Sequence, residues 1–595
     1  MPPNDSKAGM ALGVMASALP ISLLSLACLL VACRPAPSDS GSFRAGSSRP
    51  ESGPWFEDIT EQSGVRFIQR AGTNYFMPEQ MGSGIAVFDF DQDGRMDLLL
   101  LQHTDATTAS EARHQLYRQQ PDGTFLDVSS GSGLDLRSRA MGVAAGDLNN
   151  DGLPDLVIAE YLGSKVFQNL GQGRFQDVTR ESGVDNPFWA ATASLMDYNR
   201  DGRLDLVIGN YLDLDPTQLC RDSRGQRDFC SPSSFGPLPT RLWRNTTVKA
   251  GAPIRFSDES ERAGLLGARG AALGMVCADF DGDRWPDIFC ADDGRPNRLF
   301  INRRDGTFLE EAVPRGLALN AMGQTAANMG TAYGDFDRDG LADLFVTHLS
   351  DELHGLWRQE TRGLYAERLA TTGLQQQAWR GTGFGTVAAD FDWDGDLDLA
   401  LVNGLVRHSL PGQTPLQSGT AAFWGRYAQR PQLFMNLGRG SFADRSSEHP
   451  SFCGQAMVGR SLASADLNQD GAMDLIVSPV GGPVRIYRGI KPPTGHWLRL
   501  RLLEPNSGSR DAIGAEVSIR CSQGSWIQVL QPATGYFSSH EPTLHFGLGA
   551  VASVESMEVI WADGSLESFP GSAADRTLVL RRGTGRTLPP QLPAR

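Results

Sequence analysis

The sequence is short of positive charge and of cysteine. Its 54 Lys and Arg residues are outnumbered by 69 Asp and Glu residues, which gives a formal net charge of −15. This balance argues against nucleic acid as a main partner, because phosphate binding needs a basic surface. Only 8 of the 595 residues are cysteine, and no CxxC pair or Cys/His spacing typical of a zinc site is present.

Several catalytic motifs are also missing. The chain has no Gly-x-Ser-x-Gly nucleophile elbow, no Walker loop and no HExxH sequence. The hydrophobic content of 40% excludes wholesale disorder. Glycine is abundant, at 67 residues. It favours a turn-dense, all-β chain over long helices, in which each interior glycine costs roughly 1 kcal/mol.

The first 54 residues read as a targeting segment. Only Asp5 and Lys7 are charged before Cys33, and the stretch ends in Leu-Val-Ala-Cys, which resembles the lipobox of bacterial lipoproteins. We therefore predict a signal peptide at 1–32 and lipidation of Cys33, followed by a flexible Ser/Gly/Pro-rich tether to residue 54. An uncleaved membrane anchor is the alternative. Both hypotheses place the protein outside the cytoplasm, in the cell envelope or on the outer membrane of a bacterium.

Export makes disulfides possible. Cys220 and Cys230 lie together in one polar insertion and are the best candidates for a bridge. Cys277 and Cys290 flank a turn and are equally compatible with a bridge or with two buried thiols. The pairing of Cys453 and Cys521 stays open.

One acidic pattern of nine residues occurs seven times. We number these copies loops 1 to 7; their first aspartates are separated by 58, 50, 82, 56, 55 and 76 residues. Each loop has oxygen-bearing side chains at positions 1, 3, 5 and 9, and six of the seven have glycine at position 6. Loop 4 has Arg284 there, so we expect its site to be distorted or weaker than the others.

Oxygen side chains at alternate positions are the ligands that Ca²⁺ prefers, and position 7 would add its backbone carbonyl. Position 12 is apolar or cysteine instead of the bidentate Glu of an EF-hand. Positions 1, 3, 5 and 9 contain 25 aspartates, and seven Ca²⁺ ions would change the formal charge from −15 to −1. The predicted ligands are Asp89, Asp91, Asp93, Arg95, Asp97; Asp147, Asn149, Asp151, Leu153, Asp155; Asp197, Asn199, Asp201, Arg203, Asp205; Asp279, Asp281, Asp283, Trp285, Asp287; Asp335, Asp337, Asp339, Leu341, Asp343; Asp390, Asp392, Asp394, Asp396, Asp398; and Asp466, Asn468, Asp470, Ala472, Asp474.

Short apolar runs follow every loop, and an outer strand opening with Phe-x-Asp or Phe-x-Glu often closes the unit. About four strands per unit, repeated seven times, predict a seven-bladed β-propeller over residues 55–490. The seventh unit lacks its outer strand, and an orphan copy begins at Phe56. We expect that copy to complete the last blade and remove an open edge. Alternating runs predict a small β-sandwich over 491–585, with a tail at 586–595.

The acidic units resemble FG-GAP/VCBS repeats, which build integrin-α-type propellers. Residues 494–570 resemble the ASPIC/UnbV module through Asn506–Ala515, Gly535–Ser538 and Leu544–Gly549. The whole chain is similar to bacterial relatives of the cartilage acidic protein family. This resemblance implies an exported calcium-binding propeller with a C-terminal β domain, and it implies no particular reaction or substrate.

Two functions remain open at this point, besides a purely structural ring in which calcium is incidental. The first is a membrane-anchored, non-catalytic adhesion module that binds a protein or glycan at the cell surface, with Ca²⁺ stiffening its loops. The second is a glycan-processing enzyme or lectin with a site at the centre of the ring, lined by the insertions near 213–240 and 404–430. Candidate residues for that second site are His348, Asp351, His354, Arg407 and His408. We expect His496, His540 and His545 to be packed or surface residues without a metal.

Overall fold

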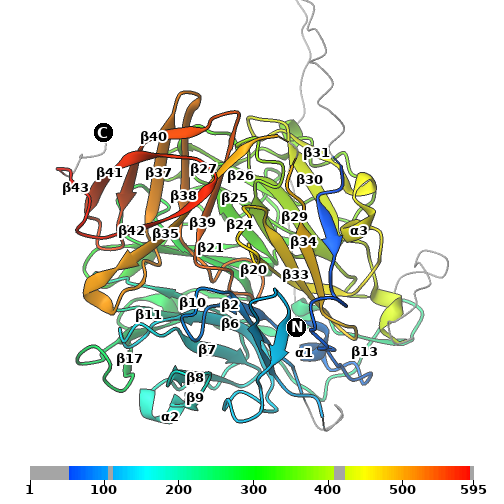
Figure 1. Ribbon diagram of the computed structural model, residues 1–595. Helices are drawn as coiled ribbons and strands as arrows, with labels where there is room; N and C mark the ends of the chain where they lie inside the picture. The colour runs from blue at the N-terminus through cyan, green and yellow to red at the C-terminus, as the bar shows by residue number, and fades with distance from the viewer. Residues whose placement is uncertain (1–52, 105–110, 408–422, 493, 590–595) are drawn as a thin grey trace, which may run out of the picture. The chain divides into compact units, whose positions relative to one another are not determined.

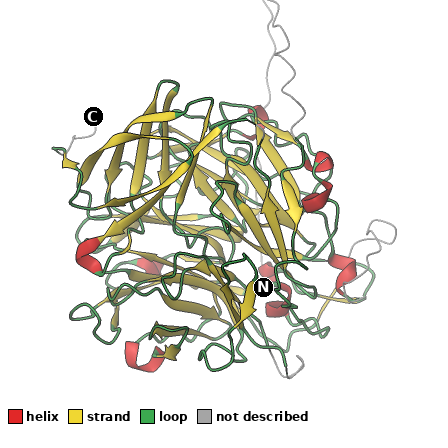
Figure 2. Cartoon of the chain, viewed as in Figure 1, coloured by secondary structure: helices red, strands yellow, loops and turns green. Residues whose placement is uncertain are grey.

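The computed structural model describes residues 53–104, 111–407, 423–492 and 494–589. The predicted signal peptide, the lipidated Cys33 and nearly all of the tether lie outside the described residues. Within the described part of the chain, no helix is both long and apolar enough to cross a membrane. The chain is almost entirely strands and turns, and its helices are short (Figure 2).

In the described residues, seven sheets each contain a row of four antiparallel strands (Figure 1). Six rows follow chain order, the seventh ends in β1 (Phe56–Asp58), and one sheet has a fifth strand, β23 (Ala326–Ala327), paired with β20 (Asp287–Arg295). The first strands are β2 (Ile85–Phe88), β6 (Ala140–Gly146), β10 (Ala190–Met196), β19 (Ala272–Ala278), β24 (Thr331–Gly334), β28 (Gly383–Ala389) and β32 (Gly459–Ala465). The second are β3 (Asp97–Leu100), β7 (Asp155–Glu160), β11 (Asp205–Asn210), β20 (Asp287–Arg295), β25 (Asp343–Val346), β29 (Asp398–Asn403) and β33 (Asp474–Pro479). The third are β4 (Gln115–Gln119), β8 (Gly163–Asn169), β16 (Arg241–Asn245), β21 (Arg298–Asn302), β26 (Gly355–Thr361), β30 (Gln432–Asn436) and β34 (Arg485–Gly489). The outer strands are β5 (Phe125–Asp127), β9 (Phe175–Asp177), β17 (Phe256–Asp258), β22 (Phe308–Glu310), β27 (Leu364–Glu367), β31 (Phe442–Asp444) and β1 (Phe56–Asp58).

The seven sheets form a closed ring. Each first strand contacts the first strands of both neighbouring sheets, in the cyclic order β2, β6, β10, β19, β24, β28, β32 and back to β2. The first strands are therefore innermost. The second strands are buried on both faces, as the apolar run Leu206–Ile208 shows, because each sheet is covered by a sheet on either side.

The N-terminal strand closes the ring. β1 pairs antiparallel with β34, with Phe56 opposite Gly489 and Asp58 opposite Tyr487. The seventh sheet is thus completed by a strand from the other end of the propeller sequence. This confirms the closure predicted from the orphan Phe-x-Asp copy, and it removes the edge that β34 would otherwise present.

The C-terminal segment forms two further sheets around their own core. One contains β36 (Arg510–Asp511), β35 (His496–Glu504), β39 (Leu544–Gly549) and β42 (Arg576–Arg581). The other contains β38 (Gly524–Val529), β37 (Glu516–Cys521), β40 (Ser553–Ile560), β41 (Leu566–Ala573) and β43 (Arg586–Thr587). Leu500, Val517 and Trp561 are buried between them, as expected for a small sandwich.

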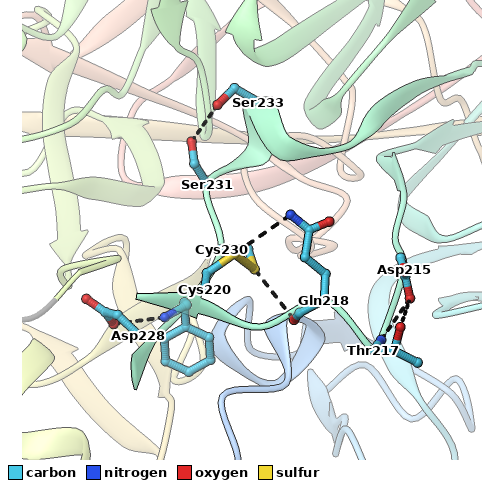
Figure 3. Close-up of a disulfide and its surroundings, with 9 residues drawn as sticks. Asp215, Thr217, Gln218, Cys220, Asp228, Cys230, Ser231 and Ser233 are labelled. Carbon is cyan, nitrogen blue, oxygen red and sulfur yellow. Dashed lines mark hydrogen bonds between the residues drawn. A yellow bond between two sulfur atoms is a disulfide. The ribbon is translucent and has the colours of Figure 1, made fainter. Parts of the chain in front are cut away.

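Short elements decorate the ring. They are α1 (Met77–Gln80), α2 (Thr179–Ser182), α3 (Pro450–Cys453), β12 (Leu212–Asp213), β13 (Cys220–Arg221), β14 (Arg227–Asp228), β15 (Gly236–Pro239), β18 (Arg269–Gly270) and β23 (Ala326–Ala327). A disulfide joins Cys220 to Cys230 in the first insertion, the pair singled out from the sequence (Figure 3). Cys277, Cys290, Cys453 and Cys521 are buried free thiols, so Cys277 and Cys290 form no bridge.

Candidate metal centres on the repeat loops

Every acidic loop connects the first strand of a sheet to the second. Its ninth residue is also the first residue of the second strand, as Asp97 is for β3 and Asp155 for β7. Because the connection is the same in all seven sheets, the seven loops lie at one end of the ring. The opposite end carries the starts of the first strands and the two long insertions.

The ninth aspartate fastens each loop to the rest of its sheet. Asp155 accepts the backbone N–H of Leu148 at 2.9 Å with one carboxylate oxygen and that of Asn169, on the third strand, at 2.8 Å with the other. The equivalent pair of bonds occurs in all seven loops. These carboxyls are buried, and burial raises their pKa, to about 8 for Asp97 and Asp343.

The first and fifth aspartates shape the turn itself. Asp89 accepts the N–H groups of Asp93 at 3.0 Å and Gly94 at 2.9 Å, and Asp93 accepts that of Arg95 at 3.0 Å. The same bonds recur in the other six loops. The backbone at position 6 has positive φ in every copy, which explains the glycine found in six of them.

Loop 4 keeps this turn without a glycine at position 6. Arg284 adopts φ +72° and still donates its N–H to Asp279 at 2.6 Å. The distortion expected from the sequence is therefore absent from the hydrogen bonds of this loop. A non-glycine residue in this backbone region costs roughly 1 kcal/mol or more, so other contacts must hold the turn.

Four loops bring three carboxylates together with ligand oxygens within 4.8 Å of one another. The groups are Asp89, Asp91, Asp97; Asp279, Asp281, Asp287; Asp335, Asp337, Asp339; and Asp390, Asp392, Asp398. Oxygens bound to one Ca²⁺ at 2.3–2.6 Å cannot lie more than about 5.2 Å apart, so the spacing fits that ion. The other three loops have asparagine at position 3, and their remaining predicted ligands belong to no such group.

The donor set of loop 1 passes a second test. Oδ1 of Asp91 is buried and accepts no hydrogen bond from the described residues. A buried charged oxygen without a partner is costly, and a bound cation is one way to satisfy it. At position 7 the predicted ligand is the backbone carbonyl. The hydrogen bond observed there is made by the backbone N–H, which donates to position 5, as Arg95 does to Asp93.

Arginines offset part of the acidic charge. Arg118 lies 2.7 Å from Asp91, Arg304 lies 2.7 Å from Asp283, and Arg338 lies 2.8 Å from Asp396. The negative charge that bound cations must neutralise is therefore smaller than the number of aspartates suggests. Arg118 and Arg304 lie outside the repeat pattern, so the pattern could not reveal them.

Successive loops are joined to one another. The residue at position 4 donates a side-chain N–H to the backbone carbonyl at position 6 of the next loop. We call this chain of contacts the belt; its six links are Gln92 to Gly152, Asn150 to Gly202, Arg200 to Arg284, Arg338 to Gly395, Trp393 to Gly471, and Gln469 to Gly94. Loop 4 has Gly282 at position 4, which has no side chain, so its link to loop 5 is missing.

The belt was not predicted from the sequence. A signal was nevertheless present, because position 4 carries an N–H donor in every loop except loop 4. Residue types at that position vary among Gln, Asn, Arg and Trp. The shared feature is therefore a side-chain N–H donor and not one residue type.

The C-terminal domain docks on the same end of the ring. Trp526 donates its indole N–H to the carbonyl of Gly395 in loop 6 at 2.7 Å, and Gly549 donates its backbone N–H to Trp393 at 2.8 Å. In loop 7, the Arg499 guanidinium lies 3.1 Å from Asp466. Glu541 accepts the backbone N–H of Asp466 at 2.9 Å. The domain thus contacts residues that the sequence assigned to metal binding.

Residues Gly535–Ser539 of this domain, which we call the tongue, enter the centre of the ring. The tongue exchanges backbone hydrogen bonds with β2 and β6: Ser539 accepts from Val87 at 2.9 Å, and Phe537 accepts from Val143 at 3.1 Å. Tyr536 is fully buried and donates its hydroxyl to the carbonyl of Met81 at 3.0 Å. The tongue therefore fills the space between the innermost strands.

The candidates for a second, central site do not form one cluster. His348 and His354 are buried, and the backbone N–H of His348 donates to Nδ1 of His354 at 3.0 Å. Asp351 and Arg407 line a cavity at the insertion end of the ring. His408 lies outside the described residues. In the C-terminal domain, His496 pairs with Asp575, His540 accepts the N–H of Ser464, and His545 is buried.

Comparison with known proteins agrees with this architecture. Residues 89–158, 147–208 and 279–346 match the FG-GAP-like repeat, and residues 505–587 match the ASPIC and UnbV domain. Cartilage acidic protein 1 of Xenopus tropicalis is 28% identical over 334 residues, which cover 54% of this chain and 46% of the relative. The protein of the same name from Homo sapiens is 27% identical over 339 residues, covering 55% and 46%. The chain thus spans about half the length of these curated relatives.

Among solved structures, one match is a lectin from Agrocybe aegerita, described as recognising non-reducing terminal N-acetylglucosamine. It is 16% identical to this chain, with a TM-score of 0.39, and the match covers 68% of this chain and 94% of the lectin.

Proposed function

We propose that the repeat loops bind Ca²⁺ and that the protein is a non-catalytic interaction module. The observation that carries this proposal is the shared position of the acidic loops and of the docked C-terminal domain. A loop that binds a cation here is also a loop that holds the belt and the domain interface. Ion binding would therefore stiffen a large surface and not only a single turn.

The loop residues have two roles: some would bind the ion, and some fix the loop to its sheet. Positions 1 and 3, with position 9 or 5, supply the clustered oxygens of loops 1, 4, 5 and 6. Position 9 also holds the loop to the third strand through two backbone N–H groups. When bound, Ca²⁺ supplies the positive charge that offsets these buried carboxylates. Because Ca²⁺ would bind the folded loops more tightly than the unfolded chain, it stabilises the fold by mass action.

The place of action that we propose is the outside of a cell. An exported chain, lipidated at Cys33 and carried on a tether, would present the propeller to a protein or glycan of the cell surface. The lipobox-like sequence and the disulfide between Cys220 and Cys230 support export. Metabolic labelling with a fatty acid should mark the full-length protein but not a Cys33→Ser variant. Equal labelling of the two proteins would contradict the lipid anchor.

Calorimetric titration with Ca²⁺ tests the metal sites, with the melting temperature followed in Ca²⁺ and in EGTA. We expect a stoichiometry of up to seven and a large rise in melting temperature. Asp91→Asn should remove one binding equivalent, whereas Glu61→Gln, at an exposed residue outside the loops, should remove none. Absence of binding by the folded protein would refute the proposal. If the protein binds to cell-envelope preparations equally well with and without EGTA, a calcium-dependent interaction is refuted.

A further inference from the structure

A cavity of about 930 Å³ opens at the insertion end of the ring, opposite the acidic loops. Its size lies in the range of small-molecule and side-chain binding pockets. Both long insertions contribute to its wall, through Ser231 and Ser233 and through Leu405–Arg407. Ser231 and Ser233 follow the disulfide in the first insertion (Figure 3). The two insertions thus build a site that the repeats alone would not form.

The inner end of this cavity is closed and apolar. Met81, Leu273, Met329 and Phe384 line it and are buried. Behind them, the tongue closes the centre of the ring: Tyr536 packs edge-on against Phe384, with ring centroids 5.1 Å apart. The cavity is therefore a blind pocket and not a channel through the propeller.

Three carboxylates and two guanidinium groups line this pocket, and among the described residues two of the carboxylates, those of Asp293 and Glu352, form no ion pair. Asp293, at the end of β20, is 8% exposed and accepts the hydroxyl of Tyr211 at 2.6 Å. Glu352 accepts the backbone N–H groups of Ala327 at 3.0 Å and Leu349 at 3.4 Å. Among the described residues, no Lys, Arg or His nitrogen forms an ion pair with either carboxylate. The nearby Arg295 instead donates to the carbonyl of Phe235 at 3.0 Å.

The lining carries one more carboxylate than it has guanidinium groups. Burial, together with repulsion from Glu352, raises the pKa of Asp293 to about 6, so its carboxyl is still mainly ionised at pH 7.5. A buried carboxylate is stabilised by a nearby positive charge, and its cost is high when none is present. The guanidinium groups of Arg295 and Arg407 line the same pocket, and Arg295 partly offsets the charge of Asp293, but neither arginine forms an ion pair with Asp293 or Glu352.

We propose that this pocket binds an ammonium or guanidinium group carried on an apolar stem. The stem would lie on the methionine-lined inner wall, and the cationic head would pair with Asp293 and Glu352. Methionine side chains suit such a ligand, because they adapt to apolar groups of different shape. The same chemistry is present in a free alkylamine and in a lysine or arginine side chain of a partner protein.

Titration of the calcium-loaded protein with small probes tests this proposal. Saturating Ca²⁺ first keeps the amines from binding at the acidic loops. We expect n-pentylammonium to bind at least tenfold more tightly than 1-pentanol, which has the same stem without the charge. Equal binding of the two compounds, or binding of neither, would overturn the proposal. N-acetyl-lysine N-methylamide distinguishes the sources: tighter binding than pentylammonium indicates a polypeptide side chain, and weaker binding a free amine.

Variants locate the site. Asp293→Asn should weaken pentylammonium binding at least tenfold and leave pentanol unchanged. Asp213→Asn removes an exposed carboxylate of the first insertion that does not line the pocket, and should have no effect. If Asp293→Asn does not fold, Glu352→Gln provides the same test at a more exposed carboxylate. Unchanged amine affinity in a folded variant of either residue would refute the assignment.

Discussion

Trp393 and Gly471 lie in successive acidic loops, and the indole N–H of Trp393 donates to the carbonyl of Gly471 at 3.1 Å. This link belongs to the belt, so hydrogen bonds connect the loops to one another without a bound cation. The ring of Trp393 also packs near Trp497 of the C-terminal domain, with centroids 6.3 Å apart. One side chain thus connects loop 6, loop 7 and the domain that docks on them.

We predict that Trp393→Phe lowers the free energy of unfolding by about 1 kcal/mol, the usual net value of one buried hydrogen bond. The substitution keeps an aromatic ring against Trp497 but removes the N–H donor. Urea unfolding in saturating Ca²⁺ would measure the loss. The calcium stoichiometry should stay unchanged, because no ligand oxygen is removed. A loss of one binding equivalent would show that the belt shapes the ligand set itself.

Aspartates at positions 3 and 9 should behave differently when changed to asparagine. Asp155→Asn leaves one buried backbone N–H facing an amide NH₂ group, and an unsatisfied buried donor costs about 1–3 kcal/mol. We expect this loss in both EGTA and Ca²⁺. Asp91→Asn should lower stability mainly in Ca²⁺, because its Oδ1 accepts no hydrogen bond from the described residues and the part-exposed ion pair with Arg118, lost under both conditions, contributes at most about 1 kcal/mol. Chemical denaturation of both variants under both conditions would show the contrast; a calcium-only effect of Asp155→Asn would make position 9 chiefly a ligand.

The loops and the closing strand were predictable from sequence because their signals are local. Seven aspartate patterns in register specify seven turns. Phe56 starts a recognisable outer strand at the N-terminal end of the propeller sequence, far in sequence from the seventh sheet that it completes. Four of the seven predicted ligand groups come together as carboxylate clusters. The arginines beside them were not predictable, because Arg118 reaches Asp91 from a neighbouring strand at no fixed sequence spacing.

Contacts between distant segments were equally hidden. Tyr536 reaches Met81 across more than 450 residues of sequence, and no repeat pattern records that contact. The two insertions predicted the end of the ring at which a cavity lies, but not most of the residues that line it. Asp351 and Arg407 line it, whereas Asp293 was missed because it lies near the end of strand β20, outside the acidic loop pattern, and belongs to no motif.

Stability should fall as the pH is lowered from about 6.5 to about 4 when Ca²⁺ is bound. Burial lowers the pKa of His114 and His354 to about 3 and that of His348 to about 4. The unfolded histidines titrate near 6.5. The unfolded state therefore binds more protons in this window, and each histidine lowers stability by up to about 1.4 kcal/mol per pH unit.

Removal of Ca²⁺ should flatten this pH dependence. In the calcium-free protein, burial raises the pKa of Asp147 to about 6 and of Asp335 to about 7. The folded state then binds more protons than the unfolded state at these carboxyls, so they gain stability as the pH falls, opposite to the histidines. Urea unfolding at several pH values, with Ca²⁺ and with EGTA, measures both slopes. Equal slopes would contradict the assignment of these carboxyls to the metal sites.

The tongue should depend on a single glycine. A Cβ on Gly84 would lie 2.0 Å from the carbonyl oxygen of Phe537, which is backbone and cannot rotate away. We therefore expect Gly84→Ala to displace the tongue and to lower the free energy of unfolding by about 3 kcal/mol, the upper range for an overpacked core. Gly425→Ala is the matched control, because a Cβ there meets no atom within 4 Å. Thermal unfolding together with limited proteolysis would distinguish a displaced tongue, which becomes cleavable near Phe537, from general loss of the propeller. A Gly84→Ala protein as stable and as protease-resistant as the Gly425→Ala control would show that the tongue does not need this close approach.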